Sequence, residues 1–87
     1  MGLYEDTVSR VREIIGEMSP ARVDDAASEQ RLIDDLEYES ISFMELALAL
    51  EAEFNLFSFD EERAGEMVTV GDVEKLIADL VVAAAAG

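Results

Sequence analysis

Apolar residues recur at helical spacing in three separate segments of this chain of 87 residues, and no stretch alternates as a half-buried β-strand would. The first segment runs from about Glu5 to Met18 and ends at Ser19, because the residue before Pro20 avoids helical dihedrals. The second runs from near Ser40 to about Phe54. The third opens with a capping box in "TVGD" and continues with an apolar stripe at Val73, Leu76, Ile77, Leu80 and Val81. These patterns predict an all-α fold.

The segments between these helices complete the predicted topology. A long loop, about residues 21–39, follows the first helix. Its sizeable apolar anchors are Val23, Leu32, Ile33 and Leu36. A short third helix is expected to begin at Asp60, because aspartate is a favourable N-cap and acidic residues follow it near the positive helix end. We therefore predict one domain over residues 1–87, a bundle of three longer helices and one short one, with a tail frayed from about 83 to 87.

Charge excludes several classes of function. The chain has 21 acidic and 6 basic residues, which gives a net charge of −15. Such a surface repels nucleic-acid phosphates and anionic lipid, and it attracts partners with basic patches. The absence of cysteine and histidine excludes disulfides, the usual zinc site, a thiol nucleophile and the commonest general base. The N-terminus lacks the features of a secretory signal, so we expect a cytoplasmic protein that binds neither nucleic acid nor membrane.

The second helix carries more apolar surface than one core face requires. One stripe, which is sufficient for a core face, consists of Phe43, Leu46, Ala47, Leu50 and Phe54. A second apolar strip, about 130° around the helix, consists of Ile41, Met44 and Leu48. Glu45 and Glu51 flank this strip. Two interpretations remain open here: the short third helix covers the strip, or the strip is a docking surface for a partner.

Ser40 lies where the acidic loop "IDDLEYE" becomes the second helix. As an isolated serine at a helix start, it is expected to be the N-cap that satisfies an unpaired backbone N–H. Nothing in the chain predicts its activation as an enzyme nucleophile, since there is no histidine and Lys75 is distant in sequence. If Ser40 takes part in covalent chemistry, another protein must supply the catalyst.

The same residues resemble the acyl carrier protein family, whose members carry a 4′-phosphopantetheine arm on a serine. The family pattern is a "DLG" loop, "DSL" at a helix start and then "VEL…ALE.EF"; this chain reads "DLEYESI", "MEL" and "ALEAEF". The later "FDEERAGEMVTVGDVEKLI" is similar to the family's third helix and the start of its fourth. The similarity extends over nearly the whole chain and implies a four-helix acyl-carrier fold. The chain departs from the pattern at Glu39 and Ile41, and at Glu37, where a glycine is common and a positive-φ turn would be strained.

The resemblance implies a non-catalytic carrier with its attachment site at Ser40. The arm would come from coenzyme A through a phosphopantetheinyl transferase and would hold acyl groups as thioesters. The implied docking residues are Glu39, Ile41, Met44, Glu45, Leu48 and Glu51. The implied partners are the transferase, a ketosynthase, an acyltransferase or acyl ligase, and tailoring enzymes of the ketoreductase or dehydratase type. The carrier alone is expected to be a monomer.

Several alternatives remain open. We favour a discrete carrier of polyketide biosynthesis, and carriage in fatty acid synthesis or in nonribosomal peptide synthesis are the alternatives within the family. An arm-less acidic module that binds a basic partner is a rival outside it. A cation site among Asp34, Asp35, Glu37 and Glu39, with Asp24 and Asp25 nearby, is a weaker rival, since no EF-hand loop is present. We therefore predict no metal site.

Overall fold

Three helices make up the regular secondary structure of the residues that the computed structural model describes, which are 2–23, 26–56 and 66–86. They are α1 (Leu3–Met18), α2 (Ser40–Phe54) and α4 (Val70–Ala86). The prediction of an all-helical fold is confirmed for this part of the chain. The short helix predicted from Asp60 lies outside the described residues.

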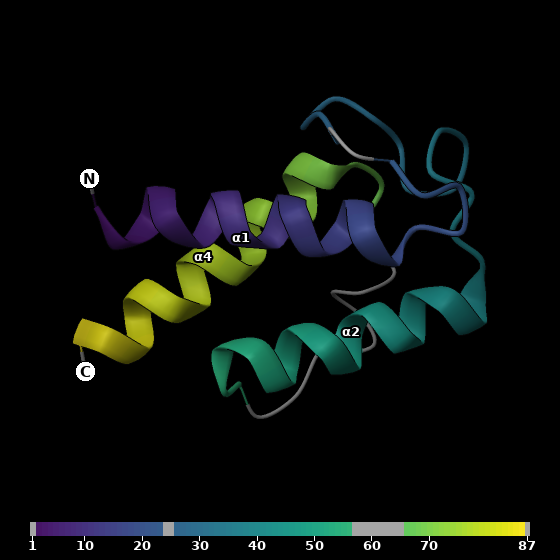
Figure 1. Ribbon diagram of the computed structural model, residues 1–87. Coiled ribbons are helices and arrows are strands. Elements are labelled where there is room, and N and C mark those ends of the chain that lie inside the picture. The colour runs from purple at the N-terminus through teal and green to yellow at the C-terminus, as the bar shows by residue number, and fades with distance from the viewer. Residues whose placement is uncertain (1, 24–25, 57–65, 87) are drawn as a thin grey trace.

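Helix α1 packs most extensively against α4, and α2 contacts α1 across the remaining side of the core (Figure 1). The two chain ends lie at one end of the molecule, and the long loop between α1 and α2 lies at the other (Figure 1). Within the described residues, no helix combines the length and apolar character that crossing a bilayer requires. Helix α4 extends as far as Ala86, and the fraying expected from about 83 to 87 stays a prediction.

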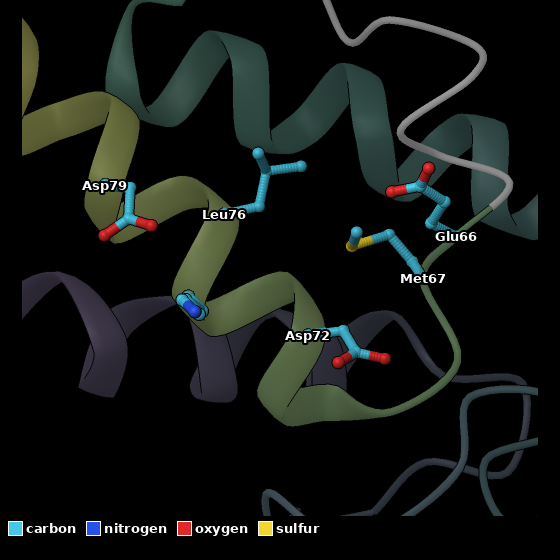
Figure 2. Close-up of a pocket in the computed structure, with 6 residues that line it drawn as sticks. Glu66, Met67, Asp72, Leu76 and Asp79 are labelled. Carbon is cyan, nitrogen blue, oxygen red and sulfur yellow. The ribbon is translucent and has the colours of Figure 1, made fainter.

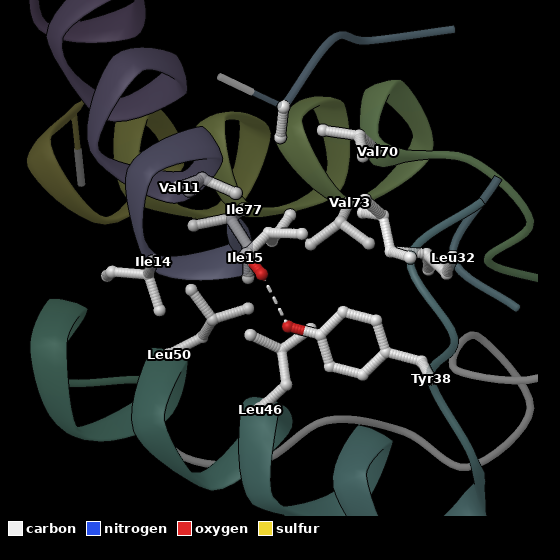
Figure 3. Close-up of a cluster of buried hydrophobic side chains, with 12 residues drawn as sticks. Val11, Ile14, Ile15, Leu32, Tyr38, Leu46, Leu50, Val70, Val73 and Ile77 are labelled. Atoms are coloured by element: carbon white, nitrogen blue, oxygen red, sulfur yellow. Dashed lines mark hydrogen bonds between the residues drawn. The ribbon is translucent and has the colours of Figure 1, made fainter. Parts of the chain in front are cut away.

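Side chains from all three helices and from the long loop form one hydrophobic core. Its buried members labelled in Figure 3 are Val11, Ile14, Ile15, Leu32, Tyr38, Leu46, Leu50, Val70, Val73 and Ile77. The helical stripes predicted from sequence supply most of these residues. Burying each side chain stabilises the fold by about 1.5–3 kcal/mol before entropy is subtracted. The loop therefore belongs to the core as much as the helices do.

Close backbone contact holds the start of the long loop against α1. Ser19 ends α1, as predicted, and its buried hydroxyl donates a hydrogen bond to the Leu36 carbonyl at 2.6 Å. The chain then turns back, so that the Val23 N–H donates to the Gly16 carbonyl at 3.2 Å. A side chain at Gly16 would collide with the Val23 carbonyl, which explains a glycine inside a helix despite its low helix propensity.

A buried polar cluster holds the middle of the loop. Glu74 of α4 is buried; one of its carboxylate oxygens accepts from Arg12 Nε at 2.7 Å and the other from the Ser28 hydroxyl at 2.7 Å. Arg12 also donates to the Ser28 hydroxyl at 2.9 Å. Because each charge has partners, the cluster avoids the desolvation cost of an unpaired buried carboxylate, and it joins α1, the loop and α4.

One predicted loop anchor is wrong. Ile33 is 72% exposed, whereas Leu32 and Leu36 on either side of it are buried. The segment forms a turn in which the Asp35 and Leu36 N–H groups both donate to the Arg31 carbonyl. Residues four apart in such a turn point the same way, so Leu32 and Leu36 face inward and Ile33 faces outward. Tyr38, which the sequence analysis did not assign to the core, is the buried side chain that follows.

Candidate functional site

Helix α2 begins at Ser40, but the residue that caps it is Glu39. Glu39 has extended dihedrals, φ −112° and ψ 176°, and its carbonyl accepts the first helical hydrogen bond from the Phe43 N–H at 2.8 Å. The Ser42 hydroxyl accepts from the Glu39 N–H at 2.7 Å. The prediction that Ser40 is the N-cap is therefore wrong by one residue. Ser42, three residues after the cap, supplies the reciprocal bond of a capping box.

This arrangement leaves the Ser40 hydroxyl uncommitted. Ser40 is exposed, and no described residue makes a hydrogen bond to its hydroxyl. It occupies the first turn of α2, where backbone N–H groups lack helical partners and the helix dipole is positive. The first turn of α2 contains no acidic residue, whereas α1 and α4 each have one or more there. The site thus presents a nucleophilic oxygen next to a region that favours an anion.

Tyr38 fixes the segment that leads to Ser40. Its side chain is buried, its hydroxyl donates to the Ile15 carbonyl at 2.6 Å, and its N–H donates to the Leu32 carbonyl at 2.9 Å (Figure 3). Burial raises the pKa of the Tyr38 phenol, because the phenolate would lose its hydration. A large aromatic between two glutamates is the sequence signal that could have identified this anchor.

The residue before Tyr38 has a left-handed backbone. Glu37 has φ 60°, the conformation for which glycine is preferred. The structure thus has the positive-φ turn at Glu37 that was expected to be strained. Glu37 lies between buried Leu36 and buried Tyr38, and its own side chain is exposed.

The second apolar strip of α2 is exposed. Ile41, Met44 and Leu48 are 72%, 66% and 64% exposed, while Leu46 and Leu50 on the other face are fully buried. Of the flanking acids predicted to dock partners, Glu39 and Glu45 are exposed and Glu51 is half-buried. In the structure the strip is thus not part of the core. Its role as a docking surface stays a prediction.

The rival cation site has no support among the described residues. No group of three or more acidic side chains in residues 2–23, 26–56 and 66–86 could hold a metal ion. Asp34 forms an ion pair with Arg31 at 3.4 Å, and Asp35 accepts the Arg31 N–H at 2.7 Å. These two carboxylates thus interact with their own turn. Asp24 and Asp25 lie outside the described residues.

A shallow depression of about 330 Å³ lies along α4 (Figure 2). Its described lining residues are Glu66, Met67, Asp72, Lys75, Leu76 and Asp79. Asp72 already caps α4: its carboxylate accepts the Val68 and Thr69 N–H groups at 2.9 and 3.0 Å, and its own N–H donates to the Thr69 hydroxyl at 3.2 Å. This confirms the capping box predicted from "TVGD". Among the described residues no ion pair joins Lys75 to a carboxylate of this depression, so Ser40 remains the candidate for covalent chemistry.

The chain is similar over most of its length to a known protein. No family model matches the sequence. The chain is 32% identical over 77 residues to the acyl carrier protein of Wolinella succinogenes, an alignment that covers 88% of this chain and 95% of that protein. The similarity therefore extends over most of the chain.

Proposed function

This chain belongs to the acyl carrier protein family, and from that premise we propose that it carries acyl groups as thioesters on a 4′-phosphopantetheine arm attached to Ser40. The observation that carries the proposal is the junction itself. Ser40 is exposed and its hydroxyl is uncommitted, while buried Tyr38 and the Glu39–Ser42 cap hold the backbone on either side of it.

The residues at the junction fit a phosphodiester-linked group. The phosphate would lie at the start of α2, whose first turn contains no acidic residue, and it would share this end of the helix with the Glu39 carboxylate, which accepts the Ser42 backbone N–H. Ser40 would hold the group covalently, and the unpaired backbone N–H groups of the first turn would face its negative charge. When attached, the arm supplies the terminal thiol on which acyl groups are held.

The chain contributes position rather than catalysis to its own modification. The Ser40 oxygen forms a new P–O bond to the phosphorus of coenzyme A that carries pantetheine. The pyrophosphate P–O bond breaks, so that adenosine 3′,5′-bisphosphate leaves, and the hydroxyl proton must go to a base. No described residue forms a hydrogen bond with that hydroxyl and so could act as the base. A phosphopantetheinyl transferase would therefore supply the catalytic groups, and the carrier would be its substrate.

The exposed strip and the acidic surface support a role in repeated, transient docking. Ile41, Met44 and Leu48 offer apolar contact, and a net charge of −15 speeds encounter with basic partners. We propose that Glu39, Glu45 and Glu51 pair with those basic surfaces. The partners in this proposal are the transferase, a ketosynthase, an acyltransferase or acyl ligase and tailoring enzymes.

Within the family we favour polyketide biosynthesis, with fatty acid and peptide synthesis as alternatives. Phe43 is half-buried against the core and is a bulky residue at a position that would border an internal acyl-holding space. A bulky residue there favours cargo that remains outside the bundle. We also retain the fourth, short helix predicted from Asp60 as part of the proposed family fold.

Intact-mass measurement after incubation with coenzyme A and a broad-specificity transferase tests the function. Wild-type protein should gain one phosphopantetheinyl group, and Ser40→Ala should gain none. Ser9→Ala is the matched control, because Ser9 is also an exposed serine on a helix and should leave loading unchanged. An unmodified wild-type protein with several transferases would support the arm-less interaction module instead. A mass gain that survives Ser40→Ala would overturn the assignment of the attachment site to Ser40.

A further inference from the structure

Ile33 is held outward by an ordered turn. It is 72% exposed, as exposed as Ile41 of the second apolar strip on α2. The turn around it is fixed by bonds to the Arg31 carbonyl from the Asp35 and Leu36 N–H groups, at 3.0 and 3.1 Å, and by burial of Leu32 and Leu36. Its exposure is therefore a property of the folded turn. An apolar side chain that is displayed in this way gains its hydrophobic stabilisation only when a partner covers it.

A second exposed apolar residue lies on the adjoining segment. The Leu32 N–H donates to the Val68 carbonyl and the Val70 N–H donates to the Gln30 carbonyl, both at 2.9 Å, so residues 30–32 and 68–70 run side by side. Val68 is 53% exposed. We call Ile33 and Val68 the loop patch. The exposed acids on these same segments are Asp34, Asp35, Glu37 and Glu66.

The loop patch and Ser40 belong to the same end of the molecule. The Tyr38 N–H donates to the Leu32 carbonyl at 2.9 Å, which ties the segment before Ser40 to the turn that displays Ile33. Figure 1 shows the long loop beside the end of α2 at which that helix begins. The apolar strip of Ile41, Met44 and Leu48 continues away from this end along α2, whereas Ile33 precedes Ser40 in the chain.

We propose that the loop patch is a contact for the enzyme that places the arm on Ser40, through an apolar pocket edged by lysine or arginine side chains. The acids around the patch provide the charge complementarity. A typical interface buries about 800 Å² per partner, roughly one seventh of the 5671 Å² surface of this chain. An enzyme that reacts at the Ser40 oxygen must bury an area of this size that is centred on Ser40. Enzymes that react at the far end of the arm are free of that constraint. This inference rests on the proposed function.

The test is the steady-state kinetics of arm transfer to apo protein with a broad-specificity phosphopantetheinyl transferase. Ile33→Ser should raise the KM for the apo carrier about 10-fold, the size of a moderate interface contact, and leave kcat unchanged. Ile33→Leu, which keeps an apolar side chain, should restore the wild-type KM. Leu3→Ser is the matched control, because Leu3 is an exposed apolar residue at the other end of the molecule. Circular dichroism should show unchanged folding, since Ile33 contributes little burial.

The outcomes separate the two proposals. A wild-type protein that takes no arm overturns the proposed function and this inference with it. Normal loading of wild-type protein combined with an unchanged KM for Ile33→Ser overturns the inference alone. The same is true if the loaded Ile33→Ser carrier shows an equal rise in KM with an acyl-loading enzyme, because the loop patch would then serve partners in general. A rise in KM with Leu3→Ser as large as with Ile33→Ser would also overturn it.

Discussion

Replacing Tyr38 with phenylalanine removes one buried hydroxyl and keeps the ring. The hydroxyl donates to the Ile15 carbonyl at 2.6 Å, and both residues are buried. The variant loses the net value of that hydrogen bond and leaves a buried carbonyl without this donor, which together cost about 1–2 kcal/mol. For a domain of this size, each kcal/mol lowers the melting temperature by about 4–8 °C. Urea unfolding and thermal melts at pH 7 measure both quantities.

The same variant should lose a specific dependence on alkaline pH. Burial raises the pKa of Tyr38 above its ordinary value of 10.0. The contribution of the neutral phenol to stability is therefore fully present below pH 10 and is lost as the pH rises from there toward the folded-state pKa. The phenylalanine variant has no such group. The difference in unfolding free energy between wild type and Tyr38→Phe should narrow as the pH rises above 10.

Tyr4→Phe provides the control, because Tyr4 is an exposed tyrosine on α1. It should leave the stability at pH 7 unchanged, because Tyr4 buries no hydroxyl in the core. If Tyr38→Phe is as stable as wild type and the two pH profiles remain parallel, the hydrogen bond to Ile15 contributes nothing. Burial of Leu36 and of the aromatic ring, together with the bond from the Tyr38 N–H to the Leu32 carbonyl, would then hold the segment before Ser40.

Three further substitutions test other parts of the structure. Glu37→Gly should raise the unfolding free energy by about 0.5–1 kcal/mol in urea titrations, since relief of the left-handed strain outweighs the added freedom of glycine in the unfolded chain; Glu37→Ala, which keeps the strain, should give no such gain. Asp72→Ala should cost about 0.5–2 kcal/mol at pH 7. Hydrogen bonds from the Thr69 and Val68 N–H groups lower the pKa of Asp72 below its ordinary value of 3.8. The cost of Asp72→Ala should therefore shrink as the pH falls below 3.8. A cost that is independent of pH would contradict the capping role. Leu46→Ala should lower the free energy of unfolding by about 2–5 kcal/mol in the same titrations, because Leu46 is buried. Met44→Ala on the exposed strip should change it by less than about 0.5 kcal/mol. Similar losses for both variants would contradict the division of α2 into two faces.

The helices could be predicted from sequence because their signals are local. Helix α2 begins and ends at the predicted residues, and α1 ends at the predicted Ser19. Periodicity and the proline after Ser19 depend only on neighbours in the chain. The position of Ser40 at the start of α2 followed from the same signals, so the sequence alone indicated the candidate site.

The loop could not be predicted in the same way, because its burial depends on distant partners. The Ser19 hydroxyl donates a hydrogen bond to the Leu36 carbonyl, and the Tyr38 hydroxyl donates one to the Ile15 carbonyl. Periodicity predicts neither of these contacts. Ile33 was therefore assigned to the core by its apolar character alone. The identity of the α2 cap was also missed, since a one-residue shift between Ser40 and Glu39 depends on where the Ser42 hydroxyl points.

The loop before Ser40 is a structural element rather than a tether. It is fastened by Ser19 to Leu36 at 2.6 Å, by Ser28 to Glu74 at 2.7 Å and by Tyr38 to Ile15 at 2.6 Å, that is, near its start, middle and end. Ordering a flexible segment on binding would cost free energy at every encounter. A carrier that meets many partners incurs that cost each time, and a loop fixed in the free protein avoids it. The uncommitted Ser40 hydroxyl on a rigid base is thus consistent with fast, weak and repeated docking, in which affinity is limited and geometry is constant.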